Sequence, residues 1–355
     1  MVKTPDVNEA YSEFASKVEG DKFARVSQGV TLSIGGIIPF GVPSGIPQLD
    51  YALERDGWPA GRIVELYGYE YCGKSTLALH SVAEVQRRGG VALWIDVEKA
   101  FDPERAQQLG VNTKDLWLAD ADSVEAIFRV CEAAASSVLA AKIKPFIMVV
   151  DSVSSVTSEY ELGKEFKETT AIAGDARVIK RGVKRLNFML SRTKAIAIFI
   201  NHAMESMAAF GSPKSTGGRA LKFMSSIRVE VSHKKELNAG KGDERERDGQ
   251  IITIKLRKAR GTPLKHPIFD INLLTSKGFD RHGSLALMLH EVGLLKFDGT
   301  HFSNADGSIN FKFKDSEEAI LRLGGYDKVY NQFIETAVQN GSIRKWGTYE
   351  QDSHI

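Results

Sequence analysis

A glycine-rich loop between a strand-like run and a helix-like run constrains this 355-residue chain more than any other feature. Residues 68–75 fit the pattern G-x-x-x-x-G-K-[ST], and Thr76 follows directly. The run before it, 62–67, is apolar, and 77–88 has apolar residues at helical spacing before Gly89 and Gly90. Such a loop surrounds phosphates with backbone N–H groups at a helix N-terminus. A chance glycine loop is the alternative, but the flanking pattern favours a nucleoside triphosphate site.

The motif also predicts a different role for each of its polar side chains. Lys74 is expected to place its charge on the β- and γ-phosphate oxygens, and Ser75 to bind Mg²⁺, with Thr76 as a second hydroxyl nearby. The ATP-binding residues predicted from the loop are Gly68, Glu70, Tyr71, Cys72, Gly73, Lys74, Ser75 and Thr76.

Composition and charge describe an ordinary soluble globular protein, with 43% hydrophobic and 26% charged residues. The net charge of +2 means that any nucleic-acid surface must be local. Cys72 and Cys131 are the two cysteines, which form no disulfide framework and suit a reducing cytoplasm. The N-terminus opens no apolar signal segment, and the apolar runs are too short to span a bilayer. Neither export nor membrane insertion is expected.

The order of elements predicts an α/β fold. Residues 8–28 read as a helix, and 34–46 as a strand and connector. Strand-like runs at 62–67, 91–96, 116–119, 145–151 and 195–201 then alternate with helical patterns, which predicts a mostly parallel sheet wrapped by helices. Runs at 227–232 and 250–256 predict a hairpin with a solvated, charged tip at 241–249. From 279 onward the pattern changes to short helices and hairpins, which we interpret as a small separate domain.

Two strands end in carboxylates that suit phosphoryl transfer. The run 146–150 leads into Asp151, which is expected to hold Mg²⁺ beside the phosphate loop. The run 91–95 leads to Asp96 and Glu98, and Glu98 is the candidate that orients the attacking water. The alternative for each is a carboxylate that caps a turn or helix.

Residues 177–186 include five basic side chains and no acidic one. Arg177, Lys180, Arg181 and Lys184 recur at helical spacing, so one helix face is strongly positive. Phosphate neutralisation dominates sequence-independent DNA binding, which makes this face a candidate track for the DNA backbone. A solvated basic helix face is the alternative. The loop 204–218 carries apolar side chains, which is unusual for a merely solvated connector, and packing on their own domain is the simplest explanation from the residues alone.

Five blocks in the same order resemble the bacterial and phage recombinase A (RecA) family. The resemblance covers almost the whole chain. The blocks are 63–68 with 73–76, then 95–103, 149–152, 199–202, and 210–213 with 216–223. The resemblance implies a RecA-type P-loop ATPase core at 38–278, an N-terminal polymerisation helix and linker at 1–37, and a small α+β C-terminal domain at 279–355. It implies ATP and Mg²⁺ as cofactors, and ATP-dependent filament formation on single-stranded DNA. The filament would pair homologous duplex DNA and exchange strands in recombinational repair.

The same resemblance implies roles for individual residues. Glu98 would be the catalytic carboxylate, Asp102 would contact adenine, and His202 would sense the γ-phosphate. Lys258 and Arg260 would reach the ATP of a neighbouring subunit. The residues implied to bind DNA are Arg177, Lys184, Met204, Met207, Phe210, Gly217, Gly218 and Arg219.

The chain also departs from the family pattern. His202 replaces the usual glutamine, and Arg105 replaces an aromatic residue that stacks on adenine, a role that a guanidinium plane also suits. The segment 203–216 is shorter than in the bacterial pattern, and the C-terminus lacks the strongly acidic tail. Two other classes remain open at this point: a ring-forming DNA helicase of the same superfamily, and a mediator or paralogue that binds a recombinase without exchanging strands. The presence of Lys74, Glu98 and Asp151 argues against the latter.

Overall fold

The computed structural model describes residues 40–163, 174–204, 218–239 and 246–345, together with Ser16, Ile38, Lys214 and Ser215. The predicted helix at 8–28, apart from Ser16, lies outside the described residues.

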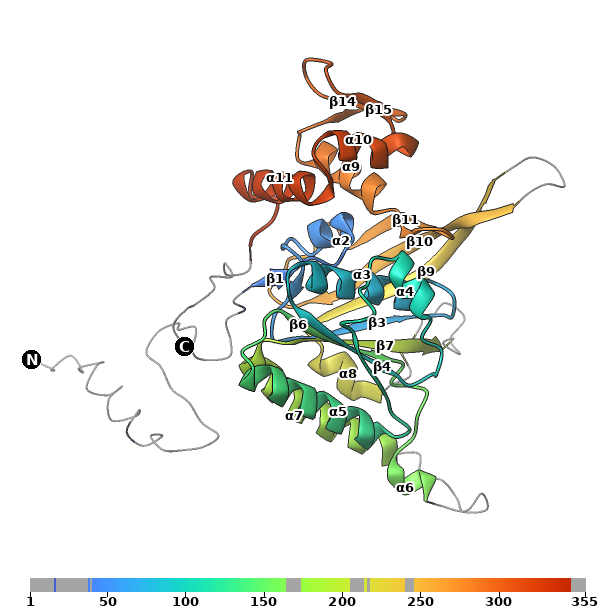
Figure 1. Ribbon diagram of the computed structural model, residues 1–355, viewed down its shortest axis with the longest axis vertical. Coiled ribbons are helices and arrows are strands. Elements are labelled where there is room, and N and C mark those ends of the chain that lie inside the picture. The colour runs from blue at the N-terminus through green and yellow to red at the C-terminus, as the bar shows by residue number, and fades with distance from the viewer. Residues whose placement is uncertain are drawn as a thin grey trace, which may run out of the picture.

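A ten-stranded sheet forms the centre of the molecule (Figure 1). Its order is β12-β11-β10-β9-β3-β7-β6-β4-β5, with the short β8 (Lys214–Ser215) paired to β7. The strands that run parallel are β3 (Ile63–Gly68), β4 (Val91–Asp96), β5 (Trp117–Asp120), β6 (Phe146–Asp151), β7 (Ile196–Met204) and β9 (Ile227–Ala239). The antiparallel side comprises β10 (Glu246–Ala259), β11 (Ile268–Leu274) and β12 (Gly278–Phe279).

Helices cover both faces of this sheet, and each face has its own hydrophobic core. Figure 1 shows α3 (Lys74–Arg87) and α4 (Pro103–Gln108) on one side, with α5 (Val124–Ala140), α7 (Gly174–Thr193) and α8 (Gly218–Met224) on the other. On β6, Ile147 and Val149 face the α3 side, while Met148 and Val150 face the α5 side. Burial on both faces explains the continuous apolar runs. The predicted α/β fold with a mostly parallel sheet is confirmed.

The helix that carries the predicted basic stripe packs closely on its neighbour. A Cβ at Gly182 of α7 would lie 2.2 Å from the ring of Phe128 on α5, so only glycine permits this approach. Ile179, Val183 and Leu186 lie in the core beneath the helix. The packed face of α7 is therefore fixed, and its basic face is directed outward.

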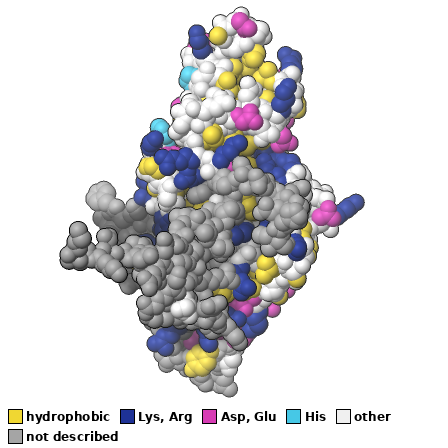
Figure 2. All heavy atoms as spheres, turned by 90° about the vertical axis from the view of Figure 1, so that its left-hand side faces the viewer, with side chains coloured by type: hydrophobic (Ala, Val, Ile, Leu, Met, Phe, Trp, Pro, Cys, Tyr) yellow, Lys and Arg dark blue, Asp and Glu magenta, His cyan; other side chains and the backbone are white. Residues whose placement is uncertain are grey.

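A third core lies in the C-terminal part. It is formed by α9 (Arg281–Glu291), α10 (Ser316–Arg322) and α11 (Tyr326–Gln339) with a sheet of β13 (Lys296–Phe297), β14 (His301–Ser303) and β15 (Asn310–Lys312), and a 3₁₀ turn, η2 (Phe313–Asp315), precedes α10. In the upper part of Figure 2, basic, acidic and hydrophobic side chains are interspersed on this unit. The small mixed C-terminal unit agrees with the expected fold class, whereas the exact domain boundaries stay predictions.

Polar contacts join this unit to the α/β core through α2 (Pro47–Ala52), which lies near the paired β1 (Gly41–Val42) and β2 (Trp58–Pro59). The Gln48 backbone N–H donates to Ser284 Oγ at 3.0 Å. The Tyr330 hydroxyl donates to Asp50 Oδ2 at 2.8 Å. Both contacts hold the C-terminal helices against the core.

Some strand boundaries predicted from the sequence were wrong. The hairpin strands reach Ala239 and begin again at Glu246, so 246–249 belongs to β10 rather than to the charged tip. Gly249 pairs with Leu237 on one side and Leu274 on the other, and this backbone pairing sustains the strand although its side chains are polar. Strand β11 was not predicted. Among the described helices, none is long and apolar enough to cross a membrane.

Candidate active site

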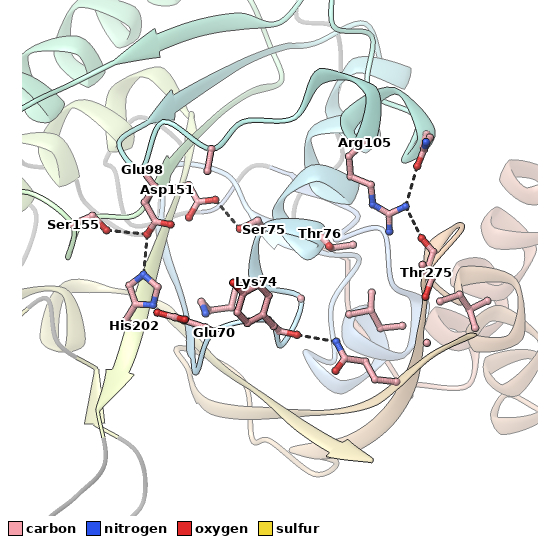
Figure 3. Close-up of a pocket in the computed structure, with 18 residues that line it drawn as sticks. Glu70, Lys74, Ser75, Thr76, Glu98, Arg105, Asp151, Ser155, His202 and Thr275 are labelled. Atoms are coloured by element: carbon pink, nitrogen blue, oxygen red, sulfur yellow. Dashed lines mark hydrogen bonds and ion pairs between the residues drawn. The ribbon is translucent and has the colours of Figure 1, made fainter. Parts of the chain in front are cut away.

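An open cleft of about 1020 Å³ lies at the carboxyl ends of the parallel strands, where α/β sheets bind ligands (Figure 3). The phosphate loop forms its floor, the ends of β4, β6 and β7 form one wall, and β10 with β11 forms the other. The structure brings together here the predicted residues Glu70, Tyr71, Gly73, Lys74, Ser75, Thr76, Glu98, Arg105, Asp151 and His202.

The phosphate loop turns into α3 at a glycine, and its side chains make contacts within the loop. Gly73 precedes α3 with φ of 90°, a left-handed conformation that glycine adopts readily. Lys74 is only 6% exposed, and its ammonium donates to the carbonyls of Gly68 at 3.1 Å and Tyr69 at 2.5 Å. Cys72 is buried, and its thiol contacts Tyr69 O at 2.9 Å. Phosphate oxygens would replace the loop carbonyls as partners of Lys74.

The predicted metal-side residues meet directly. Ser75 Oγ donates to Asp151 Oδ2 at 2.6 Å. Burial raises the pKa of Asp151 to about 6, although the hydrogen bond from Ser75 opposes this shift. A hydroxyl and a carboxylate supply the hard oxygen ligands that Mg²⁺ prefers, and Mg²⁺ usually completes its shell with phosphate and water. The residues present therefore fit this ion.

Glu98 lies at the centre of a hydrogen-bond cluster on the same wall. Its Oε1 is 2.6 Å from Ser152 Oγ, 2.8 Å from Ser155 Oγ and 2.8 Å from His202 Nε2. Burial would raise the pKa of Glu98, but the hydrogen bonds from Ser152, His202 and Ser155 outweigh it and hold the pKa below its ordinary value. Glu98 is thus held as a carboxylate that faces the cleft.

Of the two residues predicted to contact adenine, Arg105 lines the cleft and Asp102 does not. Asp102 caps α4, with its Oδ1 accepting from the backbone N–H groups of Glu104 and Arg105 at 2.9 and 3.0 Å. Asp102 is not among the residues that line the cleft. The Arg105 guanidinium donates to Thr275 O at 2.9 Å, which ties α4 to the turn between β11 and β12. Their adenine-binding roles stay predictions.

Lys258 and Arg260 are not in the cleft of their own chain. Lys258 Nζ donates to Phe223 O at 2.9 Å, and Arg260 donates to the same carbonyl at 2.8 Å, at the end of α8. Burial lowers the pKa of Lys258 to about 8, and the charges of Arg260 and Arg228 act in the same direction. Lys258 is partly buried and Arg260 is exposed, and their contact with the ATP of a neighbouring subunit stays a prediction.

The predicted DNA-binding residues fall into two groups. Arg177, Lys180, Arg181 and Lys184 are all exposed on α7. Met204 ends β7, and Gly218 and Arg219 begin α8. Met207, Phe210 and Gly217 lie outside the described residues. The structure thus presents the basic stripe to solvent.

Sequence reasoning missed several residues of the cleft. Gln250 on β10 donates to Tyr71 O at 2.8 Å and lines the cleft with Thr275 from the turn after β11, and no local pattern points to either residue. Ser155 contacts Glu98, and the run of serines directly after Asp151 was a signal that could have found it.

A family model and two individual relatives all match this chain to RecA proteins. The RecA N-terminal domain family matches residues 37–280. Protein RecA of Lactococcus lactis subsp. cremoris is 38% identical over 294 residues, which cover 82% of this chain and 73% of that protein. Protein RecA of Lactobacillus johnsonii is 34% identical over 296 residues, which cover 83% and 78%. The protein belongs to the RecA family.

Proposed function

We propose that this protein is a DNA-dependent ATPase that forms a filament on single-stranded DNA and catalyses homologous pairing and strand exchange in recombination and repair. The observation that carries the proposal is the meeting of Lys74, Ser75, Asp151, Glu98 and His202 in one cleft. The RecA relatives support it. Bacteria, the source of these relatives, hold their DNA and ATP in the cytoplasm, so this compartment is part of the proposal.

In this proposal the cleft positions ATP for attack by water. Lys74 and the loop N–H groups bind the phosphates, and Ser75 and Asp151 hold Mg²⁺. The ion would neutralise charge on the phosphate oxygens. Glu98 orients the attacking water. Phosphoryl transfer needs positioning and electrostatic stabilisation more than covalent help from the protein, and this set of residues supplies both.

His202 provides a link to DNA. It lies on β7 two residues before Met204, where the segment proposed to bind DNA begins. A shift of His202 between Glu98 and the γ-phosphate would move this strand end. ATP favours the DNA-binding state only by the free energy with which it binds that state more tightly.

Lys258 and Arg260 make assembly part of the proposed reaction. Both are remote from the cleft of their own chain and would stabilise the charge on the ATP of the next subunit. Hydrolysis would then depend on a filament, which in turn depends on DNA.

The first test is ATP hydrolysis with and without single-stranded DNA at two salt concentrations, with Lys74→Ala as the control for the site. We expect strong, salt-sensitive stimulation that Lys74→Ala abolishes. A rate indifferent to DNA would exclude the proposal. Strand-exchange assays and electron micrographs then separate the alternatives: a helicase forms closed rings, and a mediator assembles without exchanging strands.

A further inference from the structure

Among the described residues, hydrogen bonds reach only one of the two carboxylate oxygens of Glu98. All the hydrogen bonds that its side chain receives from described residues, those of Ser152, Ser155 and His202, reach Oε1. Its main chain is fixed as well, because the N–H groups of Val97 and Glu98 donate to Asp151 O at 2.8 and 3.3 Å. Oε2 is therefore available to accept a hydrogen bond from water.

The serines come from a single turn after β6. Ser155 N–H donates to Ser152 O at 3.2 Å, and the two hydroxyl oxygens are 2.7 Å apart. Val153, which follows Ser152 in the chain, donates its N–H to Ile200 O on β7 at 3.2 Å. This turn is tied to the strand that carries His202, and Figure 3 shows Glu98 between Ser155 and His202.

We propose that Ser155 is a positioning residue that, with Ser152, keeps Glu98 oriented for the attacking water when His202 turns away. This inference rests on the proposed ATPase function. A glutamate side chain has several rotatable bonds, so an unsupported carboxylate samples orientations that do not hold water in line with the γ-phosphate. The serines follow Asp151 directly in the chain, and their contacts with Glu98 do not pass through His202. Ser152 is fully buried, whereas Ser155 is exposed and can be changed without disturbing the core.

The experiment compares Ser155→Ala with Ser155→Thr and Ser154→Ala in DNA-stimulated ATP hydrolysis. A hydrogen bond to a charged group is stronger than one between neutral groups, but water replaces part of it at an exposed site, so we expect kcat to fall about three- to tenfold in Ser155→Ala. KM for ATP and ATP-dependent DNA binding should stay as in the wild type. Ser155→Thr retains the hydroxyl and should restore kcat. Ser154 contacts Ser152 Oγ at 3.2 Å but not Glu98, and its alanine variant should be unaffected.

A double-mutant cycle distinguishes failure of this inference from failure of the proposed function. Glu98→Gln should abolish most hydrolysis, and Ser155→Ala should then add no further loss, because its effect acts through Glu98. Normal turnover by Glu98→Gln would overturn the catalytic assignment itself. If Glu98→Gln fails to turn over but Ser155→Ala keeps the wild-type kcat, only the role of Ser155 is overturned. Equal losses in the alanine variants of Ser154 and Ser155 would mean that the turn, rather than the hydroxyl, matters.

Discussion

The Arg228 guanidinium lies 2.5 Å from the Glu65 carboxylate in the interior of the sheet. Glu65 is fully buried, and its other oxygen accepts a hydrogen bond from Asn201 at 3.1 Å. These residues come from the adjacent strands β3, β9 and β7, and Asn201 directly precedes His202. The pair therefore lies beneath the strand ends that form the cleft.

Replacing Arg228 by methionine should destabilise the fold strongly. The variant leaves the buried Glu65 carboxylate without its cation, and breaking such a pair costs about 3–5 kcal/mol. The free energy of unfolding in urea measures this. The double variant Glu65→Gln with Arg228→Met removes both charges and should recover much of the loss. A single variant as stable as the wild type would show that the pair contributes nothing.

Protonation of Asp50 should make stability depend on pH. Asp50 accepts hydrogen bonds from Ser44 N–H at 2.9 Å and Tyr330 at 2.8 Å, but complete burial outweighs both and raises its pKa to about 7. An unfolded Asp titrates near 3.9, so the folded chain binds more protons between about pH 4 and 7. The free energy of unfolding should therefore fall as pH rises through this window, by up to about 1.4 kcal/mol per pH unit from this group.

Urea unfolding of Asp50→Asn and the wild type at pH 5, 6 and 7 checks this. The asparagine cannot ionise, so the variant does not share the loss of stability that Asp50 causes in the wild type. The stability of Asp50→Asn relative to the wild type should therefore increase as pH rises. A difference that stays constant over these three values would contradict the raised pKa.

The basic stripe on α7 predicts a specific dependence of DNA affinity on salt. Each phosphate neutralised on single-stranded DNA contributes about 0.7 to the slope of log affinity against log salt. Arg177→Ala and Lys184→Ala should each weaken binding for all sequences alike and lower the slope by about this amount. Lys114→Ala, at an exposed lysine between α4 and β5, is the matched control. Weaker binding with an unchanged slope would mean that the stripe does not contact phosphate.

The sequence predicted the part of the site that local patterns encode. Parallel strands buried on both faces leave continuous apolar runs, so β4 and β6 and the carboxylates Glu98 and Asp151 at their ends could be found. The phosphate loop has a fixed residue spacing because its backbone must surround phosphates.

The rest of the cleft depends on contacts between distant segments. Gln250 lies on β10 and Thr275 in the turn after β11, and both complete the cleft although they are far from the phosphate loop in the sequence. Arg105 reaches Thr275 O only because α4 packs near the turn after β11, a strand that was not predicted. Lys258 lies on β10, and its contacts with the carbonyls of Lys222 and Phe223 at the end of α8 likewise follow from tertiary packing and have no sequence pattern of their own.

Lys258 should make assembly sensitive to pH on the alkaline side. Burial and the charges of Arg260 and Arg228 lower its pKa to about 8, while Glu65 opposes the shift. A phosphate partner favours the charged ammonium and would raise this pKa. Above pH 8 the assembled form therefore binds more protons than the free chain, so assembly should weaken as pH rises, by up to about tenfold per pH unit.

The protein concentration for half-maximal DNA-stimulated hydrolysis at pH 7, 8 and 9 measures this pH dependence of assembly. Lys258→Arg keeps its charge throughout and should show a flatter profile, whatever its absolute activity, whereas Lys114→Arg should follow the wild type. Parallel profiles for the wild type and Lys258→Arg would show that the charge of Lys258 does not contribute to assembly.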